Sequence, residues 1–91
     1  RPGARRENTQ DYMQRMETLE RLGRQLPGVL DCQVVQAGRE IRVFVRPESA
    51  DDEDCMKLAS QLASEIGAAL TRPGPVRVNV VRQYQASAQV E

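Results

Sequence analysis

The stretch QAGREIRVFVRP, residues 36–47, constrains the fold of this chain more than any other. From Ile41 to Arg46, aliphatic residues alternate with arginine and phenylalanine, which is the two-residue period of a β-strand with one buried face. Gly38 can adopt the left-handed conformation of a tight turn, and Pro47 lacks the N–H that a strand ladder needs. The stretch therefore predicts the second strand of a hairpin, with one face towards a core.

Two helices and two further strands are expected around this strand. The expected elements are a helix at residues 8–26, strands at 29–37 and 41–45, a helix that begins within 49–54 and ends at 70, and a strand at 76–81. Asn8 can cap the first helix, and Pro27 with Gly28 ends it. The acidic residues at 51–54 suit the positive end of the second helix dipole.

This order of elements predicts an α+β fold. A three-stranded sheet must bury at least one face, so we expect a two-layer sandwich of order α-β-β-α-β with both helices packed on one face. The strand order stays open: the last strand runs parallel to the second strand or pairs antiparallel with the first. We expect residues 1–7 to be a connector from a preceding domain, residues 8–85 to form one domain, and residues 86–91 to be a frayed tail.

Composition removes most catalytic chemistry from the chain. It has no histidine, so the commonest general base and metal ligand are missing. Its thirteen basic and thirteen acidic residues cancel, which leaves no global field that draws it to nucleic acid or a membrane surface. Cys32 and Cys55 are expected to be reduced thiols of the core. We expect a fragment that is not an enzyme and holds no metal or cofactor.

The outer face of the predicted sheet is the candidate functional surface. Its candidate residues for a protein interface are Arg42, Phe44, Arg46, Arg77 and Val81. Three interpretations stay open: a protein interface, a single-stranded RNA surface with only one aromatic residue, and a solvated face whose arginines pair with Glu40 and its neighbours. A second basic group, Arg1, Arg5 and Arg6, is a candidate for RNA contact or a solvated linker.

Several segments coincide with one family. They are RPGARRE, a helix containing YMQRMETLE, PGV, QAGREIRVFVRPE, the acidic DDED, and SEIGAALTRPGPVRVNVVR. From residue 1 to about residue 82 the chain resembles the C-terminal region of ribonuclease Y, the bacterial membrane-anchored endoribonuclease of messenger-RNA turnover. The ending RQYQASAQVE departs from the family, so no role is carried over to the C-terminal residues.

The resemblance implies a parent protein with a membrane helix, a coiled coil, a KH domain that binds RNA, and an HD-type domain that holds catalytic divalent metal. None of these elements lies in this sequence. We therefore expect a non-catalytic accessory domain that acts in dimerisation or in docking onto its own catalytic domain or onto partners of an RNA-decay complex. It would lie in the cytoplasm without direct membrane contact, under a parent anchored at the cytoplasmic face of the cell membrane. The alternatives are an RNA-guiding module that uses the exposed arginines and a small-molecule sensing domain.

Overall fold

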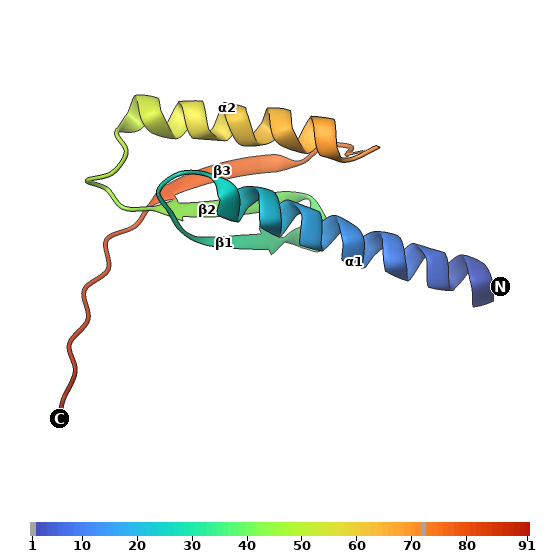
Figure 1. The fold of residues 1–91 in the computed structure, drawn as a ribbon, viewed down its shortest axis with the longest axis horizontal. Coiled ribbons are helices and arrows are strands. Elements are labelled where there is room, and N and C mark those ends of the chain that lie inside the picture. The colour runs from blue at the N-terminus through green and yellow to red at the C-terminus, as the bar shows by residue number, and fades with distance from the viewer. Residues whose placement is uncertain (1, 72) are drawn as a thin grey trace.

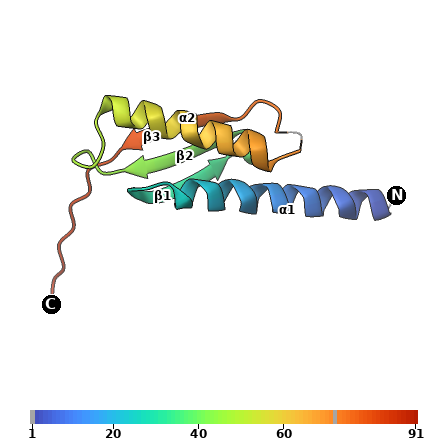
Figure 2. The same cartoon turned by 45° about the horizontal axis from the view of Figure 1, so that its top comes forward.

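The computed structural model describes residues 2–71 and 73–91, with side chains from residue 11 onward in those ranges. The elements along the chain are α1 (Pro2–Gln25), β1 (Val29–Val35), the short 3-10 turn η1 (Gln36–Gly38), β2 (Glu40–Val45), α2 (Asp52–Ala69) and β3 (Arg77–Arg82). Both helices lie on the same side of the sheet (Figures 1 and 2). The predicted α+β class and element order are confirmed.

The sheet has the strand order β1-β2-β3, so the hairpin strand β2 is central. β1 pairs antiparallel with β2, and β2 pairs parallel with β3. α2 is thus the crossover between two parallel neighbours, which decides between the two arrangements that the sequence left open. An ion pair from Arg82 to Asp52 joins the end of β3 to the first turn of α2.

The core lies between the central strand and the two helices. Ile41 and Val43 of β2 are fully buried, as are Leu19 of α1 and Leu62 of α2. These side chains belong to one cluster that also includes Leu22, Leu26, Cys32, Val45, Ala50 and Ile66. The two-residue alternation in β2 therefore places its aliphatic residues towards the helices, as the sequence predicts.

α1 begins earlier than predicted, at Pro2 rather than after Asn8. Proline is tolerated in the first turn of a helix, because its missing N–H would have no partner there anyway. Alanine, arginine and glutamate follow in the sequence, and they favour helix. The segment 2–7 is therefore helical, while its role as a connector stays a prediction and Arg1 lies outside the described residues.

β1 ends at Val35, two residues before the predicted end. The reason is the conformation of the following turn, where Gln36, Ala37 and Gly38 have φ angles of 53°, 55° and 83°. Such left-handed backbone does not continue a strand, and it is uncommon outside glycine. The chain therefore turns sharply between β1 and β2.

Arg15 fixes the direction of α1 relative to the sheet. Its Nη2 donates to the carbonyl oxygen of Gly38 at 3.0 Å and to that of Pro73 at 2.7 Å. It thereby joins the helix to the hairpin turn and to the loop before β3. Towards the N-terminus from this point, α1 extends past the sheet (Figures 1 and 2), and Tyr12 and Met13 are exposed there.

Gly23 marks the closest approach of α1 to the sheet. A Cβ atom at this position would lie 2.5 Å from Cys32 Sγ and 3.1 Å from Ile41 Cδ1. Real Cβ atoms do not come that close, so a larger residue would push the helix away from β1. Gly67 in α2 is the contrasting case, because a Cβ there would meet nothing within 4 Å.

The variants Gly23→Ala and Gly67→Ala isolate this contact. Both gain a similar helix propensity, so the difference between their unfolding free energies reports the overpacking at Gly23. We expect Gly23→Ala to be less stable than Gly67→Ala by about 1–3 kcal/mol in urea unfolding. Adding Cys32→Ala should recover part of the loss, since it removes the sulfur atom that the new methyl group meets. Equal stabilities of the two glycine variants would contradict this packing.

Candidate functional site

The face of the sheet opposite the helices, here called the open face, carries three cross-strand rows. They are Asp31, Phe44 and Val81; Gln33, Arg42 and Asn79; and Val35, Glu40 and Arg77. These residues alternate along the strands with the buried core residues. The open face is therefore built from side chains that the core does not use.

Glu40 is the centre of a polar network on the open face. Its side chain is only 9% exposed, and both carboxylate oxygens are bound. Gln36 Nε2 donates to Oε1 at 3.0 Å, while Arg42 Nε and Asn79 Nδ2 donate to Oε2 at 2.7 and 2.8 Å. The hydrogen bond from Arg42 lowers the pKa of Glu40 below its usual value, although burial acts in the opposite direction. The carboxylate is therefore held in its charged form.

The predicted interface residues differ in their surroundings. Arg42 is bound to Glu40, as the solvated-face interpretation expects. Phe44 and Val81 are neighbours in register, and Val81 is 37% exposed. Arg77 opposes Glu40 in the adjacent strand, whereas Arg46 lies just beyond the end of β2.

The second predicted group lies on the projecting part of α1. Arg5 and Arg6 are residues of this helix, but their side chains lie outside the described residues, as does Arg1 altogether. Their contact with RNA stays a prediction.

The two ends of the open face have different chemistry. At one end, Phe44 and Val81 form an apolar pair. Beyond the ends of β2 and β3 lies a surface hollow of about 460 Å³, whose lining is mostly polar but includes Leu30 and Tyr84. Leu30 and Tyr84 are 42% and 79% exposed. The other end carries Glu40 with its network. We call the first the apolar end of the open face.

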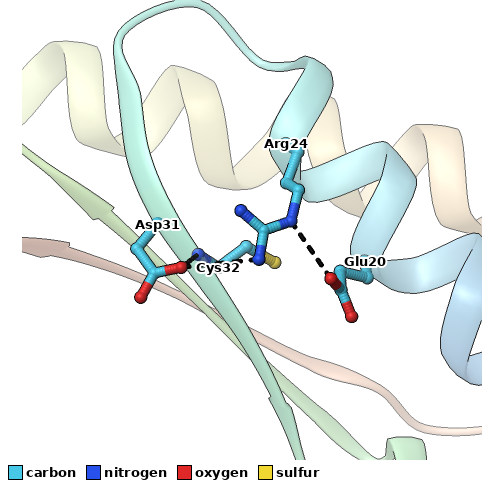
Figure 3. A network of polar contacts seen from close by, with 4 residues as sticks. All are labelled: Glu20, Arg24, Asp31 and Cys32. Carbon is cyan, nitrogen blue, oxygen red and sulfur yellow. Dashed lines mark hydrogen bonds and ion pairs between the residues drawn. The ribbon is translucent and has the colours of Figure 1, made fainter.

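The edge of the sheet next to α1 holds a separate polar group (Figure 3). Arg24 of α1 lies between Glu20, at 3.1 Å, and Asp31 of β1, at 3.5 Å. All three side chains are about half exposed, so the pairs contribute little to stability. Asp31 also accepts a hydrogen bond from the Cys32 amide at 2.8 Å. This group joins α1 to β1 at the border of the open face, where Asp31 is the neighbour of Phe44.

The acidic run forms the start of α2. The Asp51 side chain accepts from the Asp54 amide at 2.8 Å, and the Asp54 side chain accepts from the Asp51 amide at 3.1 Å. This capping box lowers the pKa of Asp51, chiefly through the bond from the Asp54 backbone. Within the ranges that the structure describes, no group of three or more Cys, Asp or Glu side chains is placed to hold a metal ion.

Glu40 is named from the sequence as a partner of the arginines. The sequence does not predict that Glu40 is buried or that Gln36 and Asn79 also donate hydrogen bonds to it. The contact between Glu40 and Arg42 can be expected from the sequence, because residues two apart on a strand lie on the same face. Asn79 is 39 residues away in the sequence, so its contact with Glu40 can be recognised only when the strand order is known.

None of the described helices has the length and apolar character to cross a membrane.

The variant Glu40→Gln tests the charged state of this network. Because the folded pKa lies below the usual 4.5, the stabilisation from the carboxylate is fully present above that pH and is lost as the pH falls through the folded pKa. We expect the wild-type chain to be more stable than Glu40→Gln at about pH 7, and the difference to shrink at about pH 3. Urea unfolding of both proteins at the two pH values measures this. A difference that does not change with pH would show that the carboxylate charge is not what stabilises the network.

Solved structures show the same fold at low sequence identity. A variant of MamM matches with a TM-score of 0.61 and 13% identity, over 78% of this chain and 95% of that one. A cadmium form of the MamM CTD matches with a TM-score of 0.59 and 14% identity, over 77% and 95% of the two chains. These likenesses concern the fold alone. No protein-family model matches the chain.

Sequence relatives are much closer. Ribonuclease Y of Thermus thermophilus is 49% identical over 86 residues, that of Clostridium botulinum 43%, and that of Syntrophotalea carbinolica 44%. Each match covers 94% of this chain but only 15–17% of the relative. The chain is thus homologous to a C-terminal fragment of ribonuclease Y.

Proposed function

We propose that the chain is a non-catalytic accessory domain of a ribonuclease Y-like endoribonuclease of messenger-RNA decay, and that its open face is a docking surface. The occupant would be the catalytic part of the same protein or a second copy of this domain. The homology to a C-terminal fragment of ribonuclease Y supports the proposal that the parent protein is ribonuclease Y-like. In this proposal the catalytic divalent metal and the membrane anchor belong to other parts of the parent, and the domain works at the cytoplasmic face.

The observation that carries the docking role is the apolar end of the open face. Phe44 is half-buried beside the exposed Val81, and the polar network of Glu40 lies on the same face. Protein interfaces typically combine an aromatic anchor and aliphatic contacts with polar groups at the rim. Because Glu40 already has its hydrogen-bond partners, a partner protein does not need to satisfy that carboxylate.

The projecting helix supports the same proposal. α1 is one continuous helix over Pro2–Gln25, and Arg15 holds it to the hairpin turn and to the loop before β3. A helix that leads into the domain in this way fixes its orientation better than a flexible linker does. The exposed Tyr12 and Met13 on this helix would then face the rest of the parent protein.

The variant Phe44→Asp tests docking. A carboxylate at the centre of an apolar contact should weaken association by at least about tenfold, because the charge loses its water without gaining a partner. Sedimentation equilibrium measures self-association of the chain, and a binding titration with the catalytic part of ribonuclease Y measures attachment. Val81→Asp is a second variant at a more exposed position, in case the first disturbs the fold.

Met56→Asp is the matched control. It introduces the same charge at an apolar side chain of α2 that is 71% exposed, away from the open face. It should leave both associations unchanged. If Phe44→Asp and Val81→Asp leave both self-association and attachment at the wild-type level, the open face is not a docking surface.

A further inference from the structure

We infer that Arg39 and Arg77 form a binding site for the phosphate groups of single-stranded RNA, at the end of the sheet where β2 and β3 begin. This inference rests on the proposed membership of the chain in a ribonuclease, but not on docking by the apolar end. Arg39 is not one of the candidate residues predicted from the sequence, and it becomes a candidate through its neighbours in the structure.

The two arginines are brought together by the parallel pairing of β2 and β3. The amide of Arg77 donates to the carbonyl oxygen of Arg39 at 2.8 Å. Both residues line a surface hollow of about 510 Å³, together with Gln36, Glu40, Pro75 and Val76. Two arginines, one glutamine and one glutamate are therefore the polar residues that line the hollow.

The charges around the hollow do not cancel. The oxygens of Glu40 accept hydrogen bonds from Gln36, Arg42 and Asn79. Arg77 is not among these donors, although its charge attracts the carboxylate and adds to the hydrogen bond from Arg42 in lowering the pKa of Glu40. Among the described residues, no carboxylate forms an ion pair with Arg39 or Arg77. Arg39 and Arg77 line the hollow together with one carboxylate, Glu40, which also pairs with Arg42. The arginines therefore outnumber the carboxylate here, and they give a local positive excess on a chain of zero net charge. Such a local field favours an anion.

The backbone on either side of the hollow is held in place before any ligand binds. On one side, the turn of Gln36 and Ala37 has left-handed φ angles that the surrounding structure must enforce. Arg15 binds the carbonyl oxygens of Gly38 and Pro73, which precede Arg39 and Arg77 in the two converging segments. The fold therefore sets the separation of the backbone segments that carry the two arginines, which lowers the backbone part of the entropy lost when a ligand binds.

Phosphate is the anion that this arrangement suits best. Guanidinium groups bind phosphate with paired hydrogen bonds, and the homologues are ribonucleases, whose substrate is RNA. No aromatic side chain lines the hollow, so base stacking would contribute nothing and binding should depend little on sequence. The strands β2 and β3 begin at the end of the sheet towards which α1 projects (Figure 1), so the hollow and the projecting helix lie at the same end of the domain.

Fluorescence anisotropy with a labelled single-stranded RNA tests the site on the purified chain. With two phosphate contacts, the wild-type affinity should fall about sevenfold between 50 and 200 mM salt. The double variant Arg39→Gln with Arg77→Gln should bind at least about tenfold more weakly at low salt, and its remaining binding should depend less on salt. The control pair Arg21→Gln with Lys57→Gln removes the same charge from exposed positions on α1 and α2, away from the open face, and should bind like the wild type.

Three results would overturn the inference. The first is wild-type affinity of the Arg39 and Arg77 double variant, and the second is an equal loss in the control pair, which would indicate a general charge effect. The third is competition by adenosine monophosphate as strong as that by unlabelled RNA at equal phosphate concentration, because the site would then bind free nucleotide. Docking is measured without RNA, so a failure of this site and a failure of the docking surface are distinguishable.

Discussion

The packing of both helices on one face of β2 is the constraint on which the rest of the structure depends. Ile41 and Val43 of this strand are fully buried against a core that includes Leu19 of α1 and Leu62 of α2. A domain of 91 residues has one modest core, and here it is formed entirely on this side of the sheet. The opposite face is consequently left to side chains that must be satisfied by one another, by water or by a partner.

The open face meets that requirement differently at its two ends. A buried carboxylate without partners would be costly, and Glu40 avoids this cost through Gln36, Arg42 and Asn79. Arg77 attracts this carboxylate electrostatically without being one of its hydrogen-bond donors, so in the proposed site its N–H groups would bind an external anion. At the apolar end, Phe44 and Val81 are neighbours across the strands, but Phe44 is only half-buried and Val81 is 37% exposed. The Glu40 network therefore lies between the proposed docking surface and the proposed phosphate site.

Much of the fold was predictable because the alternation in β2 is strict. It assigned Ile41 and Val43 to the core, and it placed Arg42 and Phe44 together on the other face. The strand order was not predictable, since a helix of this length permits either neighbour for the last strand. The start of α1 at Pro2 was not predicted, because a segment with proline and glycine is typical of a connector, although proline fits a first helical turn.

The candidate site was less accessible to sequence reasoning than the fold. The burial of Glu40 depends on Asn79 from a strand that is distant in sequence. Likewise, Arg39 meets Arg77 only through the parallel pairing of β2 and β3. The residue types alone predicted an outer sheet face of mixed polar and apolar character. The register of the three strands shows that Phe44 and Val81 lie at one end of this face and that Glu40 and Arg77 lie at the other.

Amide chemical shifts of the isotope-labelled chain test this division most directly. One sample receives single-stranded RNA, and a second receives the unlabelled catalytic part of ribonuclease Y. The two-ended surface predicts that RNA shifts the amides of Gln36, Arg39 and Arg77, whereas the protein partner shifts those of Phe44 and Val81. Shifts that fall on the same residues in both titrations, or on the outer side of α2, would contradict it.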